Sequence, residues 1–95
     1  MSVALCNLTL RLPENGSLKG KRQVVKSIQQ RLRNRFNVSI AEVEHNDTWQ
    51  LAGIAICTVS NSASHAREMV TKAVEYIEEL RLDVEIIEEH VEILD

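Results

Sequence analysis

The chain has 95 residues, of which 44% are hydrophobic and 26% charged, a composition typical of one globular domain with a single core. It contains no apolar run of about 18 residues that could span a membrane, and residues 1–10 lack the features of a signal peptide. The formal net charge is −3, but residues 1–36 carry eight Lys and Arg against one acid, whereas residues 68–95 carry two against ten acids. We therefore predict one domain over residues 1–95, with strongly unequal charge along the chain.

The first third of the chain predicts a strand followed by a helix. Apolar residues alternate over Val3–Leu12, which is the period of a strand with one fully apolar face, and a turn containing Pro and Gly follows. Ser17 is placed to cap a helix over Leu18–Phe36, in which apolar residues recur at helical spacing.

The middle of the chain predicts a β-hairpin. Asn37–His45 has strand periodicity, and a change of parity near Ala41-Glu42 indicates a β-bulge. His45–Thr48 has the composition of a turn. The strand that follows, Trp49–Ser60, is apolar on both faces, which favours a central place in the sheet or a second face covered by another chain.

The last third predicts a second helix and a final strand. Asn61–Ser64 supplies caps for a helix whose apolar stripe runs to Leu80, and Asp83–Asp95 has strand periodicity with a parity change near Ile87. The order β-α-β-β-α-β favours an α+β, ferredoxin-like split β-α-β sandwich. We expect a four-stranded antiparallel sheet of order 4-1-3-2 with two helices on one face.

Several short motifs in fixed order resemble the YlxP-like family, small bacterial proteins built on a domain of unknown function. The motifs are Ser17-Leu18-Lys19-x-Lys21-Arg22, Arg31-Leu32-Arg33-x-Arg35-Phe36-Asn37-Val38-Ser39, Ala41-Glu42-Val43, Trp49-Gln50 and Val59-Ser60-Asn61. Family members often have Trp-Gln-Arg where this chain has Trp49-Gln50-Leu51, so one basic residue is missing. The resemblance implies a ferredoxin-like fold and a gene neighbourhood of ribosome maturation and translation-initiation factors. It implies no catalytic residues.

The first predicted helix carries the clearest candidate site. Four of its cations recur at spacings of three, four and seven residues and so share one face, and no acid lies between Glu14 and Glu42. This face extends about 21 Å, enough to contact several phosphates. The predicted nucleic-acid-binding residues are Lys19, Lys21, Arg22, Lys26, Arg31 and Arg33. Two alternatives are a solvated helix face and a face covered by the acidic half of another copy.

The expected partner is structured RNA or a ribosomal subunit, contacted through its backbone. Base stacking on the sheet, as in an RNA-recognition motif, requires aromatic residues that Val3–Leu12 lacks, and we expect Trp49 to be buried or to support the hairpin. The alternative function is a protein-interaction or structural module with no nucleic-acid role. Such a module would form a homodimer through the open sheet face, where Val3 and Leu5 are apolar.

The sequence predicts a non-enzymatic protein without a cofactor or a metal. Ser17 is used as a helix cap, and Cys6 and Cys57 are expected to be reduced, buried and inert thiols in a cytoplasmic protein. His45 and Asp47 are too few ligands for a structural zinc site and are explained by the turn. No nucleophile, base and anion hole are placed together by the sequence.

Overall fold

Six elements follow one another in the predicted order in a computed structural model that describes residues 1–80 and 83–95. They are β1 (Ser2–Arg11), α1 (Leu18–Arg35), β2 (Ser39–Glu44), β3 (Leu51–Ser60), α2 (Ala63–Glu79) and β4 (Glu85–Leu94). The strands form one antiparallel sheet of order β2-β3-β1-β4, which is the predicted order read from the opposite edge. The ferredoxin-like fold class is therefore confirmed.

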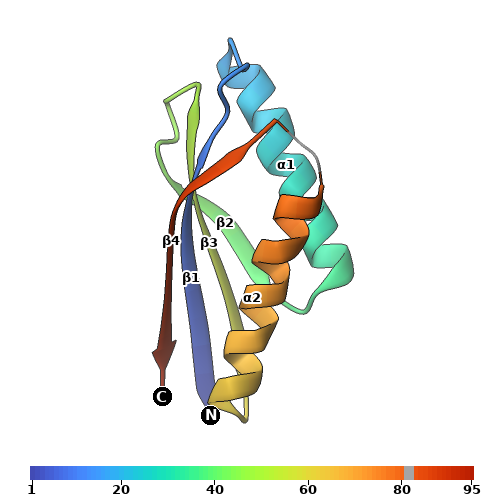
Figure 1. Cartoon of the computed structure of the whole chain (residues 1–95), viewed down its shortest axis with the longest axis vertical. Coiled ribbons are helices and arrows are strands. Elements are labelled where there is room, and N and C mark those ends of the chain that lie inside the picture. The colour runs from blue at the N-terminus through green and yellow to red at the C-terminus, as the bar shows by residue number, and fades with distance from the viewer. Residues whose placement is uncertain (81–82) are drawn as a thin grey trace.

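Both helices lie on the same face of the sheet (Figure 1). α1 packs over the edge strand β2, whereas α2 packs over β1, β3 and β4. The helix starts follow from the sequence: Ser17 Oγ accepts a hydrogen bond from the Gly20 amide at 3.0 Å, and Ser62 Oγ accepts one from the His65 amide at 3.3 Å. Both predicted caps are confirmed.

The core lies between the helices and the sheet. Alternate residues of β1 and β3 point into it, together with the apolar stripes of both helices. Its strand residues are Ala4, Cys6, Leu8, Leu10, Ile40, Ala52, Ile54 and Ile56, and its helix residues are Val25, Ile28, Leu32, Ala66, Val70, Ala73, Val74 and Ile77. Burial raises the pKa of the Cys6 thiol to about 11, and the Glu89 carboxylate adds to this effect, so this cysteine stays protonated at neutral pH.

Cys57 is the exception to the predicted burial of the two thiols. It lies opposite Leu5 on the face of the sheet that no helix covers, and it is only partly buried. The expectation that both cysteines belong to the core was wrong. Alternation along β3 places residues of odd number on the open face, and nothing within the described chain packs over that face.

The edge strands account for the two predicted parity changes. The pairing of β1 with β4 shifts between Thr9 and Leu10, where Ile87 is the extra residue, and that of β2 with β3 shifts between Glu42 and Glu44. At the second shift Gly53 has no side chain, and a Cβ there would lie 2.7 Å from the Cβ of Glu44. The bulge in β2 therefore requires glycine on its partner strand.

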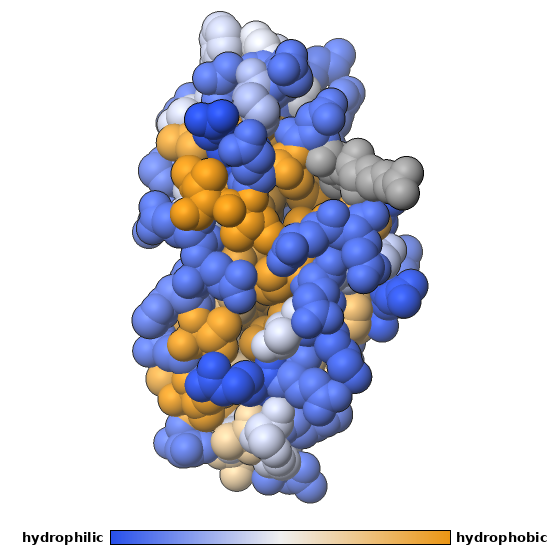
Figure 2. Space-filling model, viewed as in Figure 1, coloured by the Kyte–Doolittle hydropathy of each residue, from blue (hydrophilic) through white to orange (hydrophobic). Residues whose placement is uncertain are grey.

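Apolar side chains are partly exposed to solvent beside the edge strand β4. Figure 2 shows this surface between β4 and α2, where Ile77, Val84 and Ile86 line a groove of about 360 Å³. Glu78 and Glu89 border the same groove. These residues at the rim are acidic, whereas the exposed charged residues of α1 are basic.

Candidate nucleic-acid interface

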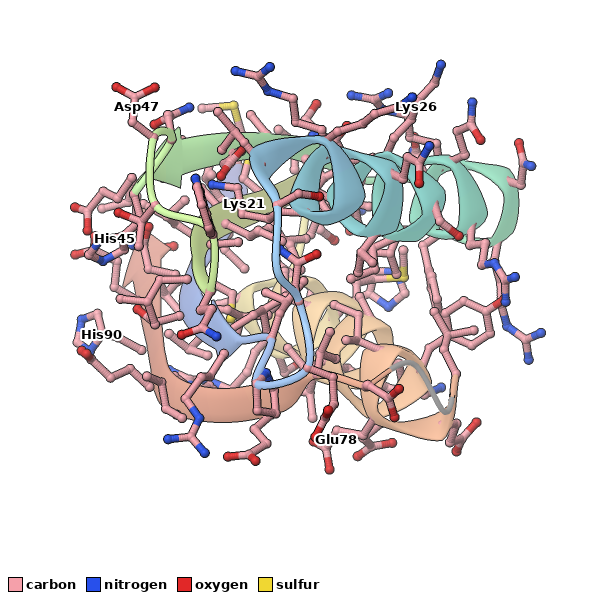
Figure 3. The ribbon with its side chains drawn as sticks, turned by 90° about the horizontal axis from the view of Figure 1, so that it is seen from above. Lys21, Lys26, His45, Asp47, Glu78 and His90 are labelled. Carbon is pink, nitrogen blue, oxygen red and sulfur yellow. The ribbon has the colours of Figure 1, made fainter. Side chains whose placement is uncertain are left out.

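The outer face of α1 carries four exposed cations in one line. The four cations are Lys19, Arg22, Lys26 and Arg33, and all of them are exposed. The buried side of the helix is formed by Lys21, Val25, Ile28 and Leu32. Figure 3 shows Lys26 pointing outward from α1, on the side of the molecule opposite α2. We refer to Lys19, Arg22, Lys26 and Arg33 as the outer α1 stripe.

A groove runs beside the outer α1 stripe, between α1 and the edge strand β2. Its volume is about 330 Å³, and its polar lining residues are Arg22, Lys26, Gln29, Gln30, Arg33 and Glu42. The Arg33 guanidinium donates a hydrogen bond to the Ile40 carbonyl at 3.0 Å, which ties the C-terminal part of α1 to β2. Beside the one carboxylate, Glu42, the groove thus combines three cations with two amide side chains, the donors that suit phosphate oxygens.

No carboxylate within residues 1–80 and 83–95 lies at ion-pair distance from a cation of the outer α1 stripe. The ion pairs found there involve Arg11 with Glu85 at 3.5 Å, Lys72 with Glu68 at 2.7 Å, and Lys21 with Glu42 at 2.8 Å. In the second pair the hydrogen bond between the two side chains, and after it their opposite charges, lowers the pKa of Glu68 and raises the pKa of Lys72. The outer α1 stripe has no such compensation, so it remains a positive surface open to an anionic ligand.

Lys21 does not belong to this surface, and its predicted role as a nucleic-acid contact is corrected. Its side chain is fully buried, with the ammonium 2.8 Å from Glu42 Oε2. The same ammonium donates to the carbonyls of His45 at 2.7 Å, Asn46 at 3.2 Å and Leu51 at 3.2 Å. Figure 3 shows it between α1 and the β2–β3 hairpin. A buried ammonium needs this full set of partners, and the Lys21 ammonium has no free hydrogen left to donate to a phosphate.

The spacing of Lys21 already contained the signal for its burial. It precedes Val25 by four residues, Ile28 by seven and Leu32 by eleven, which places it on the apolar stripe of the helix. Its partner Glu42 sits on the helix-facing side of β2, opposite Ile54. The charge of Lys21 alone does not indicate its ion pair with Glu42, whereas its helical periodicity places it on the buried side of α1.

Arg31 is exposed but lies apart from the outer α1 stripe. It is two residues from Arg33, and so about 160° around the helix from it. It is four residues from Arg35, whose guanidinium lies 4.7 Å above the ring of Tyr76 on α2. The structure therefore brings Lys19, Arg22, Lys26 and Arg33 together and leaves Arg31 on the flank that faces α2.

The acidic residues of α2 and β4 lie on the side of the molecule opposite the outer α1 stripe. Lys26 on α1 and Glu78 on α2 point to opposite sides in Figure 3. The exposed acids of α2 and β4 include Glu75, Glu78, Glu79, Glu88, Glu89 and Glu92. The separation of charge along the sequence thus becomes a separation in space, which gives the domain a positive and a negative side.

Trp49 lies outside the core. The residue is 56% exposed, so the first of the two expected roles, a buried indole, was wrong, whereas support of the hairpin stays a prediction. β3 begins at Leu51 rather than at Trp49, because residues 45–50 form the turn of the hairpin. The Thr48 amide donates to the His45 carbonyl at 3.0 Å, and His45 adopts a φ of 62°, a left-handed conformation that belongs to turns.

A ferredoxin-like domain with a basic first helix and an acidic opposite side is the class of protein that these observations define. The family model described as a protein of unknown function (DUF503) matches residues 3–91, so the chain belongs to this family. It is 41% identical over 63 residues to the uncharacterized protein YlxP of Bacillus subtilis (strain 168), which covers 66% of this chain and 68% of that protein. The resemblance to the YlxP-like family is thereby confirmed. Neither helix of the described chain has the length and apolar character needed to cross a membrane.

Proposed function

We propose that this protein is a non-enzymatic accessory protein of the cytoplasm that binds the phosphate backbone of structured RNA, in ribosome maturation or translation, through the outer α1 stripe. The observation that carries the proposal is the alignment of Lys19, Arg22, Lys26 and Arg33 on one exposed helix face, with no carboxylate of the described chain within ion-pair distance. Release of counterions from the RNA would drive such binding.

Two further features support RNA as the partner. The groove beside the stripe adds the amides of Gln29 and Gln30, which can donate to phosphate or 2′-hydroxyl oxygens. The resemblance to the YlxP-like family implies a gene neighbourhood of ribosome maturation and translation-initiation factors. A separate observation concerns the mode of contact and not the partner. The open face of β1 carries Val3, Leu5, Asn7 and Thr9, and these side chains offer no ring on which a base could stack.

The direct experiment is co-sedimentation with ribosomal subunits and gel shift with ribosomal RNA fragments, each at low and moderate salt. The test variant is Lys19→Glu/Lys26→Glu, which reverses two charges of the stripe. The matched control is Arg67→Glu/Lys72→Glu, which makes the same change of net charge with two exposed cations of α2. We expect the test variant to lose binding and the control to retain most of it. Equal losses would show that only total charge matters, which contradicts a site on α1.

A second candidate function, a homodimer through the open sheet face, is favoured by one row of side chains. Val59, Val3 and Leu94 are neighbours across three strands, and Val59 is 61% and Leu94 is 48% exposed. Exposed apolar rows of this kind are found at interfaces. Sedimentation of the protein alone tests it: a dimer that Val59→Asp dissociates supports this function, and a monomer at high protein concentration contradicts it.

A further inference from the structure

Trp49 is an exposed indole on a backbone that is held firmly in place. Its carbonyl accepts a hydrogen bond from Asn15 Nδ2 at 2.6 Å, and the same nitrogen donates to the Ser17 carbonyl at 2.6 Å. The neighbouring Gln50 carbonyl accepts from the Leu12 amide at 2.9 Å. These contacts connect the hairpin to the loop before α1 through the Asn15 side chain and through backbone groups, and the ring of Trp49 takes part in none of them.

Gly20 belongs to the same arrangement. A Cβ at this position would collide with Oδ1 of Asn15, because the Asn15 side chain lies against the first turn of α1. The glycine costs about 1 kcal/mol of helix propensity relative to alanine, and it leaves room for Asn15 to reach Trp49. Lys21, one residue later, holds the other side of the hairpin through the carbonyls of Asn46 and Leu51.

This network joins the backbone of Trp49 through Asn15 to Ser17, the residue that caps α1. Figure 1 shows the tip of the β2–β3 hairpin and the start of α1 at the same end of the molecule. Lys19 lies in the first turn of α1 and Arg22 in the next, and both are exposed. The hairpin itself carries Asp47, so attraction for phosphate at this end comes from α1.

We propose that the indole of Trp49 stacks on an unpaired base of the RNA whose phosphates bind Lys19 and Arg22. This inference rests on the proposed function and narrows its ligand to RNA with a bulge, a loop or a single-stranded end next to the backbone contact. Trp49 is exposed at the end of the molecule where the line of α1 cations begins. Aromatic rings combined with cations are how single-stranded nucleic acids are held without sequence preference. The anchored backbone limits the conformational entropy that the ring loses on stacking.

Trp49 is the single tryptophan of the chain, so its fluorescence reports on this site alone. The probe is an oligouridylate of about ten nucleotides, within the usual site size of such proteins, titrated at low salt. An abasic oligonucleotide of the same length offers the same phosphates without bases. We expect both to bind, and only the oligouridylate to quench the fluorescence. Binding followed by anisotropy of a label on the oligonucleotide is measured in parallel.

Substitution separates stacking from charge. Trp49→Ala should weaken binding of the oligouridylate about 5- to 100-fold and leave binding of the abasic oligonucleotide unchanged, whereas Trp49→Phe should retain most of the affinity. The matched control is Thr48→Ala, at an exposed neighbour on the same turn. Because Trp49 lies outside the core, all three variants should fold, which circular dichroism checks.

The outcomes distinguish this inference from the function on which it rests. Binding of both oligonucleotides with no quenching, and with equal affinity in Trp49→Ala, overturns base stacking while phosphate binding by α1 stands. Absence of binding to either oligonucleotide and to ribosomal RNA at low salt overturns both. A change of oligomeric state in Trp49→Ala, with no effect on RNA affinity, assigns the indole to a protein contact and also overturns stacking.

Discussion

The two faces of α1 carry the same kind of side chain and use it in opposite ways. On the inner face the ammonium of Lys21 is fully buried and contacts one carboxylate and three carbonyls. On the outer face the ammonium of Lys26 points into solvent, beside a groove lined by cations and amides. The cations of a basic helix therefore do not all belong to one surface that a ligand can reach. A cation that is already paired with a carboxylate inside the protein, such as Lys21, is not available to a ligand, whereas an exposed one that pairs with no carboxylate of the described residues, such as Lys26, is available.

The largest expected effect follows from removing the inner cation. Lys21→Met should lower the free energy of unfolding by about 3–5 kcal/mol, because Glu42 would remain as a partly buried charge without its counterion. That is a large share of the total stability of a small domain. Lys26→Met is the matched control and should change it by less than about 0.5 kcal/mol. Urea denaturation of both variants measures the difference, and similar losses in the two would abolish the contrast between the faces.

A smaller loss of stability is expected when Glu42, the carboxylate partner of Lys21, is made neutral. Glu42→Gln should cost about 1–2 kcal/mol, because the ammonium keeps its three carbonyl contacts and an amide oxygen can still accept from it. The Glu42 side chain is 15% exposed, which also moderates the effect. Glu44→Gln, two residues along and exposed, is the control and should be nearly silent. If Glu42→Gln were as damaging as Lys21→Met, the carbonyl contacts would contribute little and the ion pair would hold the hairpin alone.

The smallest expected effect lies at the start of α1, where neither set of cations is touched. Ser17→Ala removes the bond from the Gly20 amide to the cap and should cost about 1 kcal/mol of stability. Ser27→Ala, in the middle of the same helix, should be neutral or slightly stabilising by helix propensity. Thermal unfolding compares the two. RNA affinity should stay unchanged in both, and a loss of affinity in Ser17→Ala would mean that the helix start itself contacts the ligand.

Most of the fold could be predicted because its determinants are local. Alternation in β1, the caps at Ser17 and Ser62, and the parity changes in β2 and β4 can all be read within short stretches of chain. The strand boundaries at the hairpin could not, because residues 49 and 50 are drawn into the turn by contacts with the loop before α1. These contacts join residues 34 or more positions apart, which periodicity cannot register.

The candidate site was predicted in outline and corrected in detail. Helical spacing placed Lys19, Arg22, Lys26 and Arg33 on one face, and the structure keeps them there. The burial of Lys21 depends on a carboxylate that arrives from β2, and the exposure of Trp49 depends on how the hairpin meets α1. Both are tertiary contacts, so they became visible only when the elements were assembled.

The salt dependence of RNA affinity shows whether the outer α1 stripe binds RNA phosphates, as we propose. For a ribosomal RNA fragment, the plot of log K against log salt concentration should have a slope of about −3 to −4, the value for some four phosphates. Lys26→Met should make the slope shallower by about 1, whereas Lys72→Met on α2 should leave it unchanged. A slope near zero, or the same slope in wild type and Lys26→Met, would contradict phosphate binding by the outer α1 stripe.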